Sequence, residues 1–363
     1  MYTKAQFISY GIHTGPTGDD RELFYCGLPS ERDDLAFRLA WLAQVMKAAY
    51  SAVQEKKPDN SVLRIFMVPE FFMRGINGAY KFKNIALAIE GVQAMAGDLM
   101  FSNWLFVFGT IVGRSHPVVG PKGGPVEIYI DGGIEAYNYC PVISGGWDVD
   151  GSNNAQARQA ATHLVQKQYL STGGVTDFIS TVDNSSTWSR INYLPATRSS
   201  GPGRETQRRG DDGGAIFTVG GVTFGLEVCL DHSQGRLKAS PPLPGQPLVQ
   251  IQLVPSCGMS INKSSVVAVN GGWVFNVDGW SRVKNGRRIR GYHTDLQRVT
   301  EVAVSGATSP ASSSFDKIKL VPASTPRRVA LSESPDFVQE LYALGSGQLF
   351  VYDPVEIPAA IFA

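Results

Sequence analysis

The chain has 363 residues, of which 43% are hydrophobic and 18% charged, so it carries enough apolar material for a sizeable core. Its 33 Lys and Arg residues nearly balance 32 Asp and Glu residues, giving a formal net charge of +1. Non-specific nucleic-acid binding needs a basic excess, so this balance argues against that class. The 39 Gly and 21 Pro residues favour many short elements over a helical bundle.

Features of the N-terminus, the apolar runs and the cysteines predict the compartment. Residues 1–10 are too short and too polar for the apolar region of a signal peptide. The longest uncharged stretch, 239–262, contains five Pro residues and is not a plausible membrane helix. The cysteines are too few for a disulfide framework; they are Cys26, Cys140, Cys229 and Cys257. We expect a reduced, cytoplasmic protein that contacts neither a membrane nor nucleic acid.

Periodicity predicts strands alternating with helices. An apolar stripe with a 3.6-residue period predicts a long helix capped by Ser30; its members are Leu35, Leu39, Leu42, Met46, Ala49 and Val53. A second helix is predicted at 84–100. Strands are predicted at 6–13, 63–68, 104–112, 222–228, 249–254, 274–277 and 350–352. Two further strands, 126–130 and 135–143, are expected to pair through an Asp-Gly-Gly turn. This order indicates an α/β layer fold with hairpins, not an all-parallel sheet.

The domain organisation follows from where the pattern weakens. Residues 171–214 are rich in Ser, Gly, Asp and Arg, and a loop of this length is usually functional or mobile. Its arginines are either solvated or recognise an anionic group of a substrate; they are Arg190, Arg198, Arg204, Arg208 and Arg209. No internal repeat and no linker between two comparable cores is evident. We therefore expect one large domain at 1–285, with a long loop at about 171–214 and a C-terminal extension at 286–363.

Three reactive residues stand at the ends or edges of apolar runs. Glu70 follows LRIFMVP, Lys167 lies inside HLVQKQYL, and Cys229 follows VTFGLEV. The carboxyl ends of strands collect functional sites in α/β sheets, because loops converge there over a rigid edge. A carboxylate can accept a thiol proton, and a nearby cation lowers the thiol pKa. The three residues are therefore a sufficient set for acyl transfer.

These motifs resemble the nitrilase superfamily of carbon–nitrogen hydrolases. MVPEFFMRG (67–75) is similar to the family's general-base motif, VQKQYLS (165–171) to its lysine motif, and GLEVCLDH (225–232) to its nucleophile motif. Three further segments agree in order: FVFGTIVGR (106–114), YNYCPVISGG (137–146) and LVQIQLVPS (248–256). The likeness covers about 6–278, and the order of the motifs is its most specific feature.

The resemblance implies a four-layer α-β-β-α sandwich with mixed sheets, in homodimers or larger assemblies, with no metal and no organic cofactor. It also implies that Glu70 is the general base, that Cys229 is the nucleophile, and that Lys167 and the N–H of Leu230 stabilise the oxyanion. Asp231 is more like the amidase branches than true nitrilases, so the expected reaction is hydrolysis of a small amide through a thioester, with water as the second substrate.

The sequence departs from the family pattern at four points. Between Lys167 and Cys229 the chain is longer than the family usually allows, which implies an insertion at about 171–214. No Glu closely follows the lysine, and Asp177 is the nearest acid in a supporting position. The Arg expected soon after the nucleophile is displaced to Arg236, and Glu227 stands where an apolar or small residue is expected.

Other readings remain open at this stage. Acyl transfer to an amine, nitrile hydrolysis, and a non-catalytic binding or scaffold role all fit the same fold. Cys229 and His232 could form a Cys/His pair or two ligands of a metal, but a zinc site needs further convergent ligands that the spacing does not supply. A papain-like enzyme would carry its Cys at a helix start after a different motif.

Overall fold

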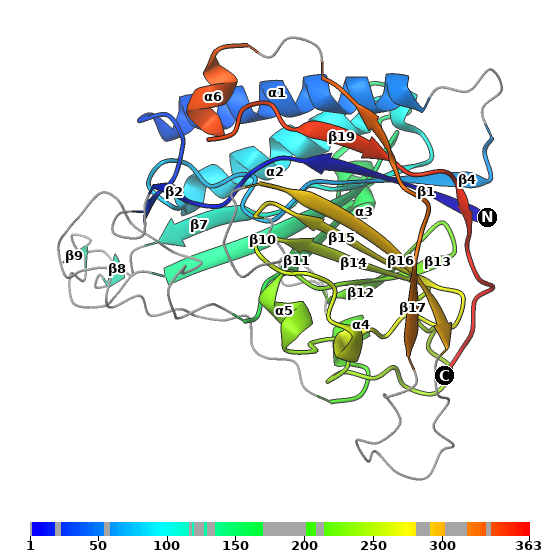
Figure 1. Cartoon of the computed structure of the whole chain (residues 1–363). Helices are drawn as coiled ribbons and strands as arrows, with labels where there is room; N and C mark the ends of the chain where they lie inside the picture. Colours follow the sequence, from blue (N-terminus) through cyan, green and yellow to red (C-terminus); the bar gives the residue numbers. More distant parts are fainter. Residues whose placement is uncertain are drawn as a thin grey trace.

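A computed structural model of the chain describes residues 2–18, 23–53, 59–115, 118–119, 127–128, 135–169, 201–207, 214–280, 291–301, 318–331 and 335–363. Within these ranges the fold is mixed α/β and contains two large mixed sheets (Figure 1). Of the site residues predicted from the sequence, Asp177 lies outside the described ranges. The described residues contain no helix that is long and apolar enough to cross a membrane.

The first sheet combines strands of the N-terminal half with three strands from the C-terminal end of the chain. Its order is β18-β19-β1-β4-β6-β10-β7-β5, with β11 paired to β10 and β20 paired to β1. Its central strands β1, β4 and β6 are parallel, whereas β10 is antiparallel to both β6 and β7. The bounds are β1 Lys4–Gly11, β4 Val62–Met67, β5 Tyr80–Lys81, β6 Trp104–Val107, β7 Ile111–Ser115, β10 Glu135–Ser144, β11 Thr162–Gln166, β18 Arg327–Val329, β19 Gln348–Val351 and β20 Val355–Glu356.

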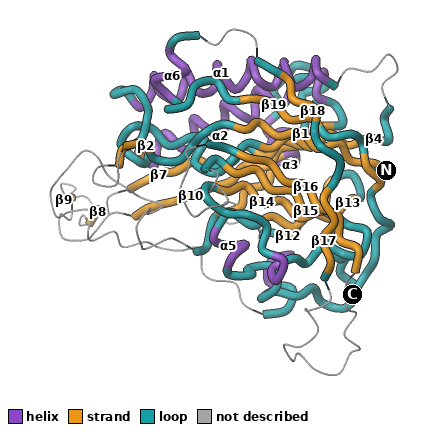
Figure 2. The backbone as a smooth tube through the Cα atoms, in the orientation of Figure 1, coloured by secondary structure: helices purple, strands orange, loops and turns teal. Residues whose placement is uncertain are grey.

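Two long helices cover the outer face of the first sheet (Figure 2). Helix α1, Glu31–Ala52, begins where the Ser30 side chain accepts a hydrogen bond from the Asp33 N–H, as the capping pattern predicted. Helix α2, Phe82–Gly97, ends earlier than predicted and is followed by a 3-10 turn, Leu99–Phe101. The members of the predicted stripe lie in one apolar cluster with Phe66 and Phe106: Leu35, Leu42, Met46, Ala49 and Val53 are buried in it, and Leu39 packs against it partly buried. The predicted stripe therefore does face the core.

The second sheet packs against the inner face of the first. Its order is β12-β13-β14-β15-β16-β17, with bounds β12 Ile216–Val219, β13 Val222–Leu226, β14 Ile251–Ser256, β15 Trp273–Asp278, β16 His293–Glu301 and β17 Lys319–Pro322. One apolar cluster joins the two sheets: Phe7 of β1 contacts Phe275 of β15 with ring centroids 5.0 Å apart. This shared core fixes the loops at the strand ends relative to one another.

The remaining described elements are short. They are β2 Thr17–Gly18, β3 Leu23–Phe24, β8 Val118–Val119, β9 Glu127–Ile128, α3 Ala155–Ala161, α4 Arg204–Gln207, α5 Leu230–Ser233, the 3-10 turn Lys263–Ser265 and α6 Phe337–Leu341. Of these, α4 and α5 bear on the site described below.

Two sequence predictions about strands were wrong. The run 104–112 forms two strands, β6 and β7, that both pair with β10. The break is at Gly109, whose φ is +60° and where a Cβ would lie 2.0 Å from the carbonyl oxygen of Pro69. The predicted pairing of 126–130 with 135–143 is also absent, because β9 pairs with β8 and β10 pairs with β6, β7 and β11. The Asp-Gly-Gly turn itself lies outside the described residues.

The C-terminal residues contribute strands to both sheets. Strand β16 pairs with β15, and β17 pairs with β16. Strand β19 lies between β18 and β1 in the first sheet, with Phe350 opposite Ser9. The described residues after 290 therefore pair within the same chain.

Candidate active site

Glu70 lies in the loop that follows β4 at its carboxyl end. Its side chain is fully buried, and its Oε1 accepts hydrogen bonds from the Nζ of Lys167 at 2.8 Å and from the Nδ2 of Asn138 at 3.1 Å. The Thr14 hydroxyl donates to the Glu70 carbonyl oxygen at 2.6 Å. Two donors on one carboxylate oxygen therefore fix the orientation of this buried acid.

Lys167 is the first residue after β11. Its backbone N–H donates to the Asn138 carbonyl oxygen at 2.9 Å, which extends the pairing of β11 with β10 by one step. Its side chain is completely buried, and its Nζ lies 5.6 Å from the centroid of the Phe71 ring. An ammonium this deeply buried requires a counter-charge, which Glu70 provides.

Cys229 lies at a sharp turn between β13 and α5. Its φ is +47° and its ψ is −105°, a conformation that L residues rarely adopt. Its N–H donates to the Pro255 carbonyl oxygen at 3.0 Å, and its Sγ lies 4.0 Å from the carbonyl oxygen of Cys257. Phe71, next to Glu70, also has a positive φ of 63°. Strain of this kind costs about 1–3 kcal/mol per residue and collects at functional sites.

Asp231 connects the lysine segment to the nucleophile turn. Its carboxylate accepts from the N–H of Gln168 at 3.0 Å and of Tyr169 at 2.8 Å, the two residues that follow Lys167. Burial raises the pKa of Asp231 to about 6, while the charges of Arg236 and Lys167 oppose this rise. Asp231 stands two residues after Cys229, so one side chain sets the distance between the strand end that carries the lysine and the turn that carries the thiol.

A buried Arg completes this connection. Arg236 donates from Nη1 to Asp231 at 3.0 Å and to the Gln166 carbonyl oxygen at 2.7 Å. Its Nε and Nη2 donate to the two oxygens of Glu205, at 2.9 and 3.1 Å. Glu205 lies in α4, inside the region predicted as an insertion, and also accepts from the Gln168 side chain at 3.1 Å. It is an acid beside the lysine segment that the sequence analysis missed.

Glu227 and His232 form a second buried network beneath the nucleophile turn. Glu227, whose presence in a strand position was unexpected, accepts from the Leu237 N–H at 2.8 Å and from the Gln252 side chain at 2.8 Å. The Nδ1 of His232 lies 2.7 Å from Glu227, and its Nε2 accepts from the Asn262 N–H at 2.9 Å. Both ring nitrogens are therefore engaged here, which does not favour a Cys/His pair.

The surroundings of two other thiols, Cys140 and Cys257, disfavour their ionisation. Burial, followed by the negative charge of Glu70, raises the pKa of the Cys140 thiol. Burial, followed by the charges of Asp278 and Glu70, likewise raises the pKa of Cys257. Both thiols are therefore disfavoured as thiolates. Among the residues that the structure describes, no group of three or more His, Cys, Asp or Glu side chains could hold a metal ion.

Some of the residues predicted for the site are in direct contact in the structure, and others are connected through a third residue. Glu70 and Lys167 are in direct contact, and Asp231 links the lysine segment to Cys229. Leu230 begins α5 directly after the thiol. Of the loop arginines, only Arg204 is described, and it is exposed. Asn138 was missed, although an amide in the apolar and aromatic run YNYCPVI was a usable signal.

Comparisons with known proteins add the following findings. No family model matches the chain, and no curated protein does. Among solved structures, it is similar to the NitN amidase from Nesterenkonia sp. AN1, with 10% identity over 96% of this chain and 92% of that one and a TM-score of 0.41. It is similar to Nit3 of Saccharomyces cerevisiae, a member of branch 10 of the nitrilase superfamily, with 13% identity over 98% and 90% and a TM-score of 0.40.

A third similar structure is a CN-hydrolase superfamily protein from Xanthomonas campestris, with 9% identity over 98% of this chain and 91% of that one and a TM-score of 0.40. Independently of these structures, the sequence motifs described above resemble the nitrilase superfamily. The chemistry proposed below rests on this chain's own side chains.

Proposed function

We propose that the chain is a cysteine-dependent carbon–nitrogen hydrolase of the nitrilase superfamily that cleaves a small amide through a thioester. The observation that carries this proposal is the buried 2.8 Å ion pair of Lys167 and Glu70, which Asp231 ties to the turn bearing Cys229. A scaffold protein would gain nothing from these charges, because an apolar core of equal volume is usually at least as stable. The strained backbone of Cys229 supports the same conclusion.

The chemistry is assigned to the residues as follows. Glu70 accepts the thiol proton of Cys229, and the thiolate attacks the amide carbonyl carbon. The ammonium of Lys167 and the N–H of Leu230 stabilise the oxyanion. Glu70 then gives its proton to the departing amine as the carbon–nitrogen bond breaks, which leaves a thioester. It next removes a proton from water, the resulting hydroxide displaces the thiolate, and the acid leaves.

The resemblance also supports two further proposals, one about the layers of the fold and one about its assembly. The two packed sheets with α1 and α2 outside the first correspond to three layers of a four-layer α-β-β-α sandwich. A second helical layer outside the other sheet belongs to this proposal, as does assembly into homodimers or larger oligomers.

Alkylation by iodoacetamide at neutral pH tests the activated thiol. Cys229 is only 8% exposed, whereas Cys26 is half-buried, so accessibility alone predicts that Cys26 reacts faster. We expect the reverse order in peptide mass spectra of the wild-type protein, and loss of the Cys229 preference in Glu70→Gln. Cys257→Ser is the matched control and should leave the preference intact. Alkylation of Cys229 no faster than of Cys26 would count against the proposal.

Turnover separates hydrolysis from acyl transfer. A panel of primary amides and nitriles is incubated with the protein, with and without hydroxylamine, and ammonia, acid and hydroxamate are measured. Hydrolysis predicts acid and ammonia from amides in the absence of any added amine. Hydroxamate with negligible acid would instead favour transfer, and turnover of nitriles alone would favour nitrile hydrolysis.

A further inference from the structure

A large cavity opens between the beginnings of α1 and α2. Its volume is about 610 Å³, within the range of about 300–1,000 Å³ that is typical of small-molecule sites. Its polar lining comes from the starts of both helices, from β7 and from the loop after β4; it includes Glu31, Arg32, Asn77, Lys81, Lys83 and Arg114. The reaction proposed above uses none of these residues.

Positive side chains dominate this cavity. Four cations line it, and Glu31 is the one acid among the lining residues. Three of the cations, Arg32, Lys81 and Lys83, are exposed. Within the described part of the chain, their side chains form no ion pair and no hydrogen bond. The fold therefore does not use these three charges for its own contacts.

Glu31 does not balance these charges, because the protein already uses its carboxylate. One oxygen, Oε2, accepts from the Lys81 N–H at 2.8 Å and from the Asn84 Nδ2 at 2.6 Å. The other oxygen, Oε1, lies 3.5 Å from Nη2 of Arg114. The side chains of Arg114 and Glu31 are only 13% and 14% exposed, and their charges compensate each other. The positive charges of Arg32, Lys81 and Lys83 remain uncompensated along the cavity.

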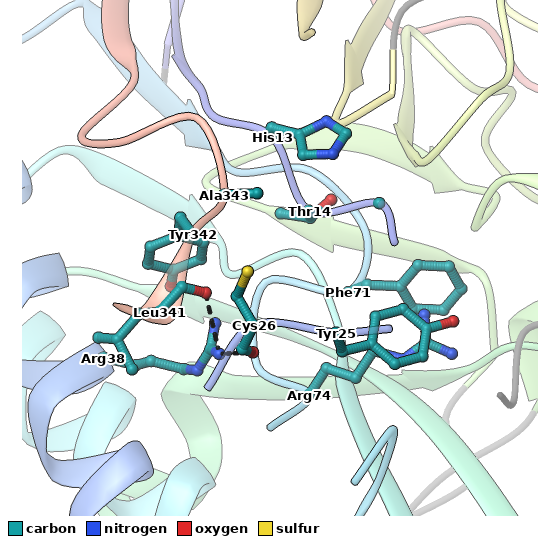
Figure 3. A pocket seen from close by; sticks show the side chains of 11 residues that line it. His13, Thr14, Tyr25, Cys26, Arg38, Phe71, Arg74, Leu341, Tyr342 and Ala343 are labelled. Atoms are coloured by element: carbon teal, nitrogen blue, oxygen red, sulfur yellow. Dashed lines mark hydrogen bonds between the residues drawn. The ribbon is translucent and has the colours of Figure 1, made fainter. Parts of the chain in front are cut away.

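A smaller cavity nearby shows how the fold treats a cation that it needs for its own structure (Figure 3). It is lined by α1 and by the loop after β4, and its volume of about 20 Å³ holds about one water molecule. Arg38 in this cavity pairs with Asp34 at 2.7 Å and donates to the carbonyl oxygens of Cys26 and Leu341 at 2.9 and 3.2 Å. The cations of the large cavity have no such contacts and surround a far larger space.

Several cations around a concave space match a small ligand with more than one negative charge. Lysine ammonium groups bind phosphate as point charges, and an arginine fork adds directed N–H groups. The apolar side chains of Pro29 and Leu87 line the same cavity and can contact an organic part of the ligand. The net charge of the whole chain is only +1, which argues against a long nucleic acid as the ligand.

The large cavity borders the loop that carries the proposed general base. Strands β1 and β4 are parallel, and α1 and α2 follow them in the chain. Both helices therefore begin on the side of the sheet where the carboxyl ends of these strands lie, and where Glu70 follows β4. Asn77 lines the cavity from the same loop as Glu70. A ligand in the cavity would thus lie against a segment of the candidate active site.

We propose that this cavity binds the diphosphate or triphosphate group of a small organic molecule, with Arg32, Lys81 and Lys83 as the counter-charges. This inference goes beyond amide hydrolysis and does not depend on it, because binding is measured without turnover. The same phosphate chemistry fits a separate effector or the distal end of a substrate.

Titration calorimetry of the full-length protein tests the proposal. The probes are ADP and inorganic triphosphate, and adenosine is the uncharged comparison. We expect ADP and triphosphate to bind, adenosine not to bind, and added salt to weaken binding because exposed charges are screened. Lys81→Gln combined with Lys83→Gln should weaken ADP binding about 10–100-fold, because each hydrogen bond to a charged group contributes up to about tenfold at an exposed site.

Two further variants make the test specific to the cavity. Lys47→Gln combined with Lys319→Gln removes the same charge from exposed positions near the other end of α1 and on β17, and should bind ADP like the wild type. Glu31→Gln keeps an acceptor for the Lys81 N–H but removes the negative charge from the cavity, so it should bind ADP severalfold more tightly.

The outcomes separate this proposal from the proposed hydrolysis. Failure of both ADP and triphosphate to bind would overturn it, as would equal weakening in the two double-lysine variants, because net charge alone would then explain the affinity. Displacement of ADP by duplex DNA at equal phosphate concentration would also overturn it. If triphosphate raises KM for an amide without changing kcat, the cavity holds the distal end of the substrate; a change in kcat indicates a separate effector. An unreactive Cys229 would contradict the hydrolysis and leave phosphate binding intact.

Discussion

Replacing Arg236 by Met tests whether the buried charge cluster holds the lysine segment and the nucleophile turn together. The guanidinium is shared between Asp231 and Glu205, and all three side chains are fully buried. Removing one partner of such a pair costs about 3–5 kcal/mol, because a charge is left in a medium that solvates it poorly. Asp231 keeps the N–H groups of Gln168 and Tyr169, so we expect a value near the lower end, about 3 kcal/mol.

Urea unfolding followed by tryptophan fluorescence at pH 7 measures this cost. The matched control is Lys4→Met, which also removes a cation from an ion pair, but one whose atoms are 3.9 Å apart and whose side chains are 40% and 74% exposed. Exposed pairs contribute about 0–1 kcal/mol, so the control should unfold close to the wild-type midpoint. Arg236→Met should also lower amide turnover, since the lysine segment loses its anchor.

A triple variant separates charge from packing. Arg236→Met combined with Asp231→Asn and Glu205→Gln removes the uncompensated charges as well, and neutral replacement of a buried ion cluster is often tolerated. We expect the triple variant to regain part of the lost stability. If Arg236→Met is no less stable than Lys4→Met, or if the triple variant is less stable than Arg236→Met alone, the electrostatic account is wrong.

Three further outcomes are expected. Asn138→Leu removes a hydrogen-bond donor from Glu70. We expect kcat/KM to fall about tenfold, which is the effect of losing one hydrogen bond to a charged group, and the unfolding midpoint to change little. An unchanged kcat/KM would contradict this. Because the pKa of Asp231 is raised, the folded chain holds the proton of this carboxyl group more tightly than the unfolded chain does. The resulting contribution to stability is present below about pH 4 and is lost as pH rises through about 6. Asp231→Asn should therefore flatten the dependence of the unfolding free energy on pH in urea titrations, and an unaltered dependence would count against this. A hydrogen bond with Asp278 raises the pKa of His293. The contribution of His293 to stability is therefore present below about pH 6.5 and is lost as pH rises through the higher pKa of the folded state. In Asp278→Asn the NMR titration of His293 should move to lower pH, and an unshifted titration would refute the pairing.

Local patterns in the sequence predicted the elements that carry the reactive residues. The stripe on α1 and the Ser30 cap are short-range features, and the structure confirms both. The apolar runs before Glu70 and Cys229 also become β4 and β13, because hydrophobic runs of this length bounded by turn residues form buried strands. These predictions needed no information from elsewhere in the chain.

What the sequence did not predict depends on residues that are far apart in it. Asn138 reaches Glu70 across 68 residues, and Arg236 reaches Glu205 across 31. The break between β6 and β7 arises where Gly109 passes close to the Pro69 carbonyl, a contact that periodicity does not encode. Strand β19 pairs with β1 and so brings the two ends of the chain together, which local patterns also do not encode.

Mass spectrometry of the acyl-enzyme tests the central claim most directly. The full-length protein is mixed with an amide that it turns over, quenched in acid within the first turnovers, and digested at low pH, where thioesters survive. The account predicts the mass of the acyl group on the peptide that contains Cys229, and loss of both adduct and turnover in Cys229→Ser. An acyl group on another residue, or ammonia release by Cys229→Ser at the wild-type rate, would contradict it.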